Sequence, residues 1–344
     1  MKTALSLSIL ILGCAGPRKT SPAPATTQGP NICSTAQRLA AGGSFARAAD
    51  GVAIWYKLAG RKGAPTIAYL HGGPGYNAFA FEQSSGRLLE SRFQVLYIDQ
   101  RGCGRSGFHG SPSQYGMSKT VDDIEQIRAS IGVGRLILLG HSFGGLVAAE
   151  YARRYPAHVS AIVMIDIAPD VHRALEHQVA TIDAVAETKF PVEASRIHAI
   201  AQSDGKPFEK LFRLYELLGR VPIQRHLHYA APQAQEKMER VDGASGIMGC
   251  TSSEVLSAFE REGYLLGPRP SVAARITVPT LLIAGRSSHV IGADNIRFAA
   301  EIWGARVQWL ETGHFVYFER PDEFANAVES FVWGTGILEQ ASPR

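Results

Sequence analysis

The sequence predicts an α/β fold, a doubly wound and mostly parallel sheet that is interrupted by a helical cap insertion. Unbroken apolar runs recur along the chain, and each run ends in a loop rich in glycine or polar residues. Amphipathic helical patterns fill the gaps between the runs. Strands buried on both faces of a parallel sheet have such sequences, and functional loops follow the carboxyl ends of strands in doubly wound sheets.

Six apolar runs predict the main strands, after a hairpin expected around Asp50 and Gly51 within residues 46–58. A Thr-Val-Asp-Asp segment at 120–123 predicts a capping box that opens a helix ending near Ile131. Further helices are expected over 145–155 and from Pro321 onward. The six strand segments are 66–70, 95–98, 136–139, 161–165, 280–284 and 307–310.

Residues 171–270 break this alternation, because they show helical patterns without a strong buried-strand run. We interpret them as a helical cap over the carboxyl edge of the sheet. Residues 34–170 and 271–344 then form one core domain, for which a chain of 344 residues is long enough.

The amino terminus predicts export. Met1 and Lys2 precede an apolar run at 4–12, which is too short to span a bilayer and is typical of a secretory signal. The run closes with Ile-Leu-Gly-Cys at 11–14, which resembles the bacterial lipoprotein signal. That resemblance implies a signal peptide over 1–13 and a lipid on Cys14. An ordinary cleaved signal with an incidental Cys14 is the alternative.

Residues 14–33 hold four prolines among Ser, Thr and Ala, and we expect an extended tether there. The protein is therefore expected in the bacterial cell envelope, attached to the membrane through lipidated Cys14 and facing the periplasm or the exterior.

Composition excludes several classes of protein. The formal net charge is only +4, and no run of four or more basic residues occurs, so we expect no binding of nucleic acid. Four cysteines are too few for a disulfide scaffold. Cys33 and Cys250 could pair in an oxidising compartment, whereas Cys103 is expected to be a free thiol. No metal-ligand spacing occurs, and we expect no cofactor.

The strongest signal is Gly-His-Ser-Phe-Gly at 140–144, a G-x-S-x-G motif between an expected buried strand and a helix. Its glycines allow a turn too tight for side chains on both sides of the serine. Ser142 would stand at the strand tip in a strained conformation, where the helix amino terminus favours developing negative charge. The motif predicts Ser142 as a nucleophile.

Besides this motif and His314, the sequence contains two further glycine-rich motifs. They are His-Gly-Gly-Pro-Gly at 71–75 and Asp-Gln-Arg-Gly-Cys-Gly-Arg-Ser at 99–106. From about residue 45 to 335 the chain resembles the α/β-hydrolase superfamily, and within it the proline iminopeptidase-like branch of a serine peptidase clan. The cap matches only in position. The resemblance implies an oxyanion hole made by the amides of Gly73 and Phe143, and His314 as general base.

In this superfamily the serine and the histidine are joined by an acid to form a catalytic triad, and the sequence leaves open which residue is that acid. The family pattern implies an Asp in G-R-x-D after the strand at 280–284, but Ser288 stands at that position. Asp166 follows the preceding strand, where pancreatic-type lipases and some haloalkane dehalogenases carry their acid. The order Ser142, Asp166, His314 keeps the chain order of the superfamily. Asp294 is a more distant candidate, and a triad without a carboxylate is the third possibility.

We expect a serine hydrolase that cleaves a small ester or an N-terminal, prolyl-type amide through an acyl-enzyme on Ser142. An esterase fits the same core motifs as an aminopeptidase. A catalytically impaired relative that binds a ligand is the alternative from another class. The partners expected are a small-molecule or short-peptide substrate and the membrane, and the oligomeric state is open.

The branch resemblance also implies acidic cap residues that bind the α-ammonium of a peptide substrate. The cap offers eight glutamates, none of which we can match to the family pattern: Glu176, Glu187, Glu193, Glu209, Glu216, Glu254, Glu260 and Glu262.

Overall fold

The computed structural model describes residues 42–106, 111–247, 249–264 and 276–336. The expected signal peptide, Cys14, the tether and Cys33 lie outside these ranges, so their assignments stay predictions. In the part of the chain that the structure describes, no helix is long and apolar enough to cross a membrane.

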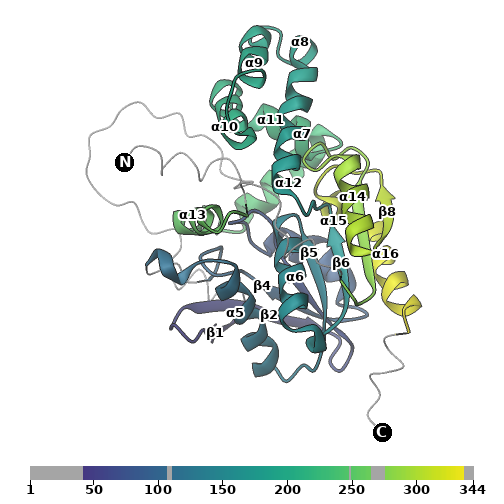
Figure 1. The fold of residues 1–344 in the computed structure, drawn as a ribbon. Coiled ribbons are helices and arrows are strands. Elements are labelled where there is room, and N and C mark those ends of the chain that lie inside the picture. Colours follow the sequence, from purple (N-terminus) through teal and green to yellow (C-terminus); the bar gives the residue numbers. More distant parts are fainter. Residues whose placement is uncertain (1–41, 107–110, 248, 265–275, 337–344) are drawn as a thin grey trace.

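An eight-stranded sheet forms the centre of the molecule, in the order β1-β2-β4-β3-β5-β6-β7-β8 (Figure 1). The β1–β2 and β2–β4 pairs are antiparallel, and the other five pairs are parallel. This confirms the expected doubly wound, mostly parallel sheet. The strands are β1 (Ser44–Arg47), β2 (Ala53–Gly60), β3 (Thr66–Leu70), β4 (Gln94–Ile98), β5 (Leu136–His141), β6 (Val159–Ile165), β7 (Thr280–Gly285) and β8 (Arg306–Leu310).

The apolar runs become central strands because helices cover both faces of the sheet. Along β3, Ala68 and Leu70 pack into one hydrophobic cluster, whereas Ile67 and Tyr69 pack into the cluster on the opposite face. Side chains of a strand alternate between its two faces, so a strand covered on both sides is apolar at every position. The helices of the core are α3 (Phe79–Phe81), α4 (Arg87–Leu89), α5 (Met117–Ser130), α6 (Phe143–Arg154), α14 (Ala293–Trp303), α15 (Val316–Glu319) and α16 (Pro321–Gly334).

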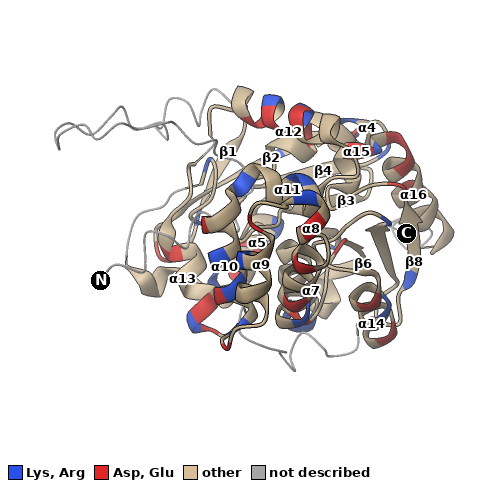
Figure 2. Ribbon diagram, turned by 90° about the horizontal axis from the view of Figure 1, so that it is seen from above, with Lys and Arg blue, Asp and Glu red and all other residues tan. Residues whose placement is uncertain are grey.

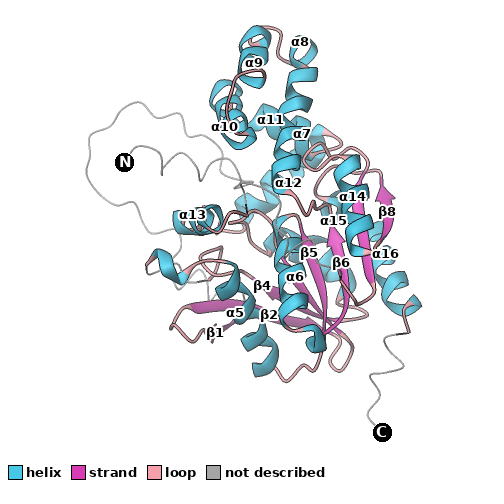
Figure 3. Ribbon diagram, in the orientation of Figure 1, coloured by secondary structure: helices cyan, strands magenta, loops and turns pink. Residues whose placement is uncertain are grey.

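Between β6 and β7, all regular elements that the structure describes are helices. They lie on the side of the sheet to which the arrows of β5 and β6 point (Figure 3). Figure 2 shows acidic and basic residues of this segment interspersed on α7, α8 and α10. The helices are α7 (Val171–Ala184), α8 (Ala186–Lys189), α9 (Ala194–Ala201), α10 (Pro207–Leu218), α11 (Arg220–His228), α12 (Pro232–Ala244) and α13 (Ser253–Arg261).

The predicted capping box at 120–123 is wrong, because α5 begins three residues earlier, at Met117. Thr120 lies inside the helix, where its hydroxyl donates to the carbonyl of Gly116 at 3.0 Å. The carboxylate of Glu262 accepts the Met117 N–H at 2.9 Å and so satisfies a free amide of the first turn. The acceptor comes from a residue 145 positions away, which a local sequence pattern could not show.

The glycines of the 140–144 motif allow α6 to lie directly against the sheet. A Cβ on Gly144 would stand 2.0 Å from the carbonyl oxygen of Leu70 on β3, and one on Gly140 would stand 2.6 Å from the carbonyl oxygen of Gly144. Both contacts are with backbone atoms, which cannot move aside without shifting β3 or α6. The tight turn that presents Ser142 therefore depends on both glycines.

We predict that Gly144→Ala lowers the free energy of unfolding by about 2 kcal/mol or more, because the new methyl group forces α6 away from β3. Gly243→Ala is the matched control, since a Cβ there meets no atom within 4 Å on an exposed face of α12. It should leave stability unchanged or raise it by about 0.5–1 kcal/mol. Urea unfolding of both variants measures the difference, and equal stabilities would contradict the packing argument.

Candidate active site

Ser142 occupies the turn between β5 and α6. Its φ of 50° and ψ of −125° place it in the left-handed region, and its N–H donates to the carbonyl of Ile165 at 2.9 Å. The side chain is half-buried and lines a cavity. The turn thus holds the hydroxyl at the carboxyl edge of the sheet, where a ligand can reach it.

Asp166 occupies the equivalent place at the end of the neighbouring strand β6. Its φ is 44°, and its N–H donates to the carbonyl of Ile283 on β7 at 2.9 Å. Within the described residues, Ser142 and Asp166 are the only residues other than glycine with positive φ. A positive φ strains the backbone of a residue that carries a side chain. Backbone strain of this kind persists only where the surrounding structure enforces it, and it is common at functional sites.

Three donors converge on the buried carboxylate of Asp166. The Nδ1 of His314 lies 2.6 Å from Oδ2, the Ser288 hydroxyl donates to the same oxygen at 2.5 Å, and the Gly285 N–H donates to Oδ1 at 3.1 Å. Ser288, which occupies the usual acid position, therefore binds the carboxylate and not the imidazole. The structure brings Asp166 and His314 together.

Asp294, the more distant candidate for the acid, lies apart from this cluster. Its side chain is 89% exposed on α14 and pairs with Arg297 at 2.7 Å. A carboxylate so exposed does not contact the buried His314.

The backbone of His314 is fixed on both sides by two histidines that the sequence analysis did not select. Its N–H donates to the carbonyl of His228, at the end of α11, at 2.7 Å. Its carbonyl accepts from Nε2 of His141 at 3.1 Å. His141 precedes the nucleophile in the motif, and His228 belongs to the insertion. The imidazole is therefore held from the turn of Ser142, from the helical segment and from Asp166.

Burial sets the protonation of this cluster. It lowers the pKa of His314, and it lowers the pKa values of His141 and His228 well below their usual range. Burial also raises the pKa of Asp166, while the bonds from Ser288 and Gly285 oppose that rise. At neutral pH, His314 is thus a neutral imidazole that directs its Nδ1 hydrogen at Asp166 and keeps Nε2 as a proton acceptor.

Gly73 and Phe143 line the same cavity as Ser142. In the part of the chain that is described, neither backbone N–H makes a hydrogen bond. Phe143 is the first residue of α6, whose amide has no partner within the helix. Gly73 has a φ of 117°, a conformation that favours glycine, and a Cβ there would lie 2.4 Å from the nitrogen of Gly75. Both amides are available to a ligand oxygen.

The loop that carries Gly73 is tied to the end of β4. Nε2 of His71 accepts the Gln100 N–H at 3.0 Å, and the Gln100 side chain donates to the His71 carbonyl at 2.7 Å. Asp99 accepts the Ala78 N–H at 2.8 Å and pairs with buried Arg105 at 2.7 Å. The 99–106 segment therefore supports the glycine loop and does not itself line the cavity.

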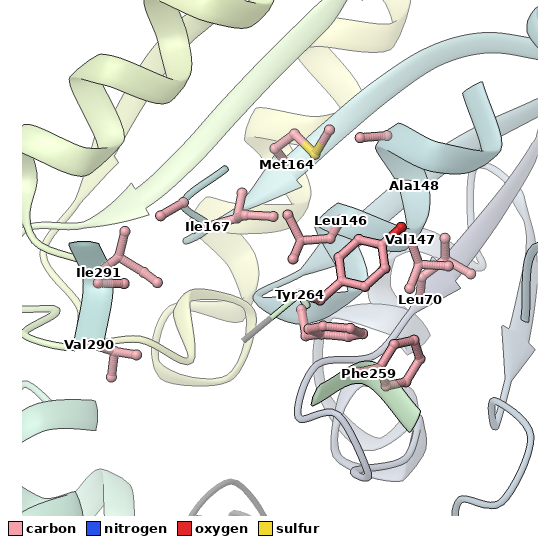
Figure 4. Packing of buried hydrophobic residues seen from close by; sticks show 14 of the residues in the cluster. Leu70, Leu146, Val147, Ala148, Met164, Ile167, Phe259, Tyr264, Val290 and Ile291 are labelled. Carbon is pink, nitrogen blue, oxygen red and sulfur yellow. The ribbon is translucent and has the colours of Figure 1, made fainter. Parts of the chain in front are cut away.

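The cavity beside Ser142 has a volume of about 130 Å³ and a mostly apolar wall. Four of its apolar residues, Leu146, Ile167, Val290 and Ile291, are visible in Figure 4. Its described lining includes no Asp or Glu. The eight glutamates of the insertion are exposed or half-buried, and none of them lines the cavity.

A family model described as the alpha/beta hydrolase fold matches residues 65–321, which is most of the chain. The chain belongs to the α/β-hydrolase family. This assignment agrees with the strand order, the turn at Ser142 and the contact between His314 and Asp166. Groups of His, Cys, Asp or Glu able to hold a metal ion are absent from the described ranges.

Proteins similar to this α/β-hydrolase include a proline iminopeptidase and an esterase. The proline iminopeptidase PfmaB of Pestalotiopsis fici is 26% identical, over 82% of this chain and 96% of its own. A proline iminopeptidase-related protein from Thermus thermophilus has a similar structure, with a TM-score of 0.70 and 22% identity over 85% of this chain and 97% of its own. The esterase RhEst1 from Rhodococcus sp. also has a similar structure, with a TM-score of 0.61 and 20% identity over 86% of this chain and 99% of its own.

Glu319 is another residue of the site that the sequence analysis missed. Its carboxylate accepts the Gly313 N–H at 3.0 Å and the Ala230 N–H at 3.1 Å. Burial raises its pKa to about 7, although both backbone bonds lower it. Glu319 thus joins the loop that carries His314 to the segment after α11. The only feature of the sequence that could have pointed to Glu319 is its position five residues after His314, at the end of α15.

We predict that Asp166→Asn slows labelling of Ser142 by a fluorophosphonate by about 10³- to 10⁴-fold, because Asn cannot stabilise the charged imidazolium. Asp294→Asn, on the exposed face of α14, is the matched control and should label like the wild type. Gel-based labelling rates measure both variants. Near wild-type labelling of Asp166→Asn would remove Asp166 from the chemistry.

We predict that Glu319→Ala slows the same labelling by about tenfold, because the His314 loop loses a fixed acceptor and its geometry loosens. Glu319→Gln should fall between Ala and wild type, since the two backbone bonds go to different carboxylate oxygens and an amide keeps only one oxygen. Glu311→Ala is the control, because Glu311 is exposed and pairs only with Arg286 in the described structure. Equal rates in the three variants would show that Glu319 does not position His314.

Proposed function

We propose that this protein is a serine carboxylesterase that hydrolyses small esters with an apolar acyl group through an acyl-enzyme on Ser142. The observation that carries this proposal is the cavity itself, which is apolar, neutral and open to Ser142. An uncharged acyl group gains from leaving water for such a wall, whereas a charged group would lack a partner there.

In the proposed reaction, the Ser142 oxygen attacks the ester carbonyl carbon while Nε2 of His314 takes the hydroxyl proton. The amides of Gly73 and Phe143 donate to the oxyanion of the tetrahedral intermediate. Each such donor typically lowers the barrier by about 2.7–4 kcal/mol. Asp166 stabilises the imidazolium, and Ser288 and Gly285 hold the carboxylate in place.

The intermediate then collapses as His314 returns the proton to the leaving alcohol, and the acyl group remains on Ser142. Water attacks the acyl-enzyme by the same route, with His314 again taking and returning a proton. The reaction releases the carboxylic acid and restores the Ser142 hydroxyl.

Cleavage of an N-terminal prolyl-type amide is the second candidate. It is favoured by the similarity to the Pestalotiopsis fici iminopeptidase, which extends over nearly the whole of that enzyme. A peptide substrate of this kind carries an α-ammonium group next to the scissile bond. The described wall of the cavity has no carboxylate to pair with that charge, and the amide therefore ranks below the ester.

Paired assays test the order of these candidates. We expect the wild type to hydrolyse p-nitrophenyl butanoate with a kcat/KM at least about 10²-fold above that for prolyl-p-nitroanilide, and Ser142→Ala to lose both activities. A preference for the prolyl amide would reverse the assignment. If a fluorophosphonate fails to label Ser142 and both substrates stay intact, the chain is a ligand-binding relative and not an enzyme.

We predict that kcat/KM for the ester rises with pH along an acidic limb whose midpoint lies below about 6.5, the usual histidine value. Below that midpoint His314 is protonated and cannot accept the Ser142 proton, and burial lowers its pKa. Glu319 and Asp166, each with a pKa raised to about 7, titrate in a higher window, so the profile is repeated with Glu319→Gln to remove the first of these contributions. A midpoint above 7 that persists in that variant would contradict the assignment of His314.

Export and lipid attachment through Cys14 are also part of this proposal. Cys250 is disulfide-bonded, and such bonds persist mainly in oxidising compartments. Cys33, its expected partner, lies outside the described residues, whereas Cys103 is a buried free thiol. Membrane fractionation tests the anchor. The wild type should sediment with membranes and Cys14→Ser should not, and a soluble wild type would contradict lipidation.

A further inference from the structure

Gln178 places a polar group in the mostly apolar wall of the cavity. It lies on α7, is 7% exposed and lines the cavity together with Val171, Ala174 and Leu175 of the same helix. Its side-chain nitrogen donates to the carbonyl of Val290 at 3.1 Å. A carbonyl only accepts hydrogen bonds, so this contact fixes which end of the amide is nitrogen and leaves Oε1 at the opposite end.

Tyr215 adds a second polar group from α10, which packs against α7. It is 6% exposed and lines the same cavity. Burial raises the pKa of its hydroxyl, which therefore stays protonated. Among the described residues, neither the Tyr215 hydroxyl nor Oε1 of Gln178 has a hydrogen-bond partner. Both residues line the cavity, where a polar atom without a protein partner is free to bind water or a ligand.

The chemistry of these two groups restricts the ligand. Oε1 of Gln178 accepts only, whereas the Tyr215 hydroxyl donates and accepts. Both groups are neutral, and no Asp or Glu stands in the described wall. A hydroxyl or an amide N–H on the ligand would match them, whereas an ammonium or a carboxylate would be buried without a counter-charge. The apolar residues around them leave room for carbon chain on either side of such a substituent.

We propose that Gln178 and Tyr215 form a specificity subsite for acyl groups that carry a neutral hydrogen-bond donor, a hydroxyl or an amide N–H. This inference rests on the proposed esterase function and narrows its substrates to esters of hydroxy acids or acylamino acids. The carbonyl carbon of the substrate lies at Ser142, and the substituent reaches the wall formed by α7 and α10.

Matched ester pairs test the subsite. For each of several chain lengths, kcat/KM is measured for the p-nitrophenyl ester of a straight-chain acid and of the acid that has a hydroxyl or an acetamido group in place of a methyl. We expect the wild type to prefer the substituted ester by about five- to tenfold at one chain length, the effect of one net hydrogen bond. Tyr215→Phe and Gln178→Leu should reduce that ratio to about one while hydrolysis of the plain ester continues.

Tyr56→Phe is the matched control, because Tyr56 lies on β2 outside the cavity, and it should keep the wild-type ratio. Gln178→Leu also removes the bond to Val290, so if that variant fails to fold, Tyr215→Phe decides alone. A wild type that hydrolyses both esters equally at every length would overturn the subsite and leave the esterase proposal standing. Loss of all ester hydrolysis together with unlabelled Ser142 would overturn the esterase proposal itself.

Discussion

The carboxylate of Asp166 ties together the loops that follow three neighbouring strands. It stands at the end of β6, receives hydrogen bonds from the last residue of β7 and from Ser288 in the loop after it, and faces His314 in the loop after β8. Because these strands are parallel, their carboxyl ends share one edge of the sheet, and a single buried anion can gather donors from each. The carboxylate lies next to the strained turn of Ser142, which hydrogen-bonds back to β6. Without this anion, three loops would lose their common partner.

The fold was predictable from sequence because its signals are local. The buried strands are largely apolar, and the alternation of strands and helices follows from those apolar runs. Contacts between distant segments were not predictable. Glu262 accepts the N–H of Met117 at the start of α5, and no pattern near Met117 indicates this contact. The sequence could name Asp166 and Asp294 as candidates, but only coordinates show that one faces His314 and the other faces solvent.

The residues missed at the site share one property, since they act on backbone atoms. His141 binds the carbonyl of His314, His228 accepts its amide and Glu319 accepts the amide of Gly313. Sequence motifs describe the side chains that react. They do not include the groups that hydrogen-bond to the backbone of those residues. The bond from His314 to His228 and the bond from Ala230 to Glu319 join the core to the helical insertion, so the segment that lines the cavity also fixes the proposed general base. Substrate contact and catalytic geometry are therefore mechanically linked in this α/β-hydrolase.

Ser288 shows how closely the two proposed places for a triad acid approach each other. Its hydroxyl touches the same carboxylate oxygen that faces His314, at 2.5 Å. An aspartate there would bring a second carboxylate against Asp166 in a buried site, and one of the two would have to hold a proton. A serine at position 288 instead donates to the anion and adds no charge, so the Asp166 carboxylate can stay ionised beside His314.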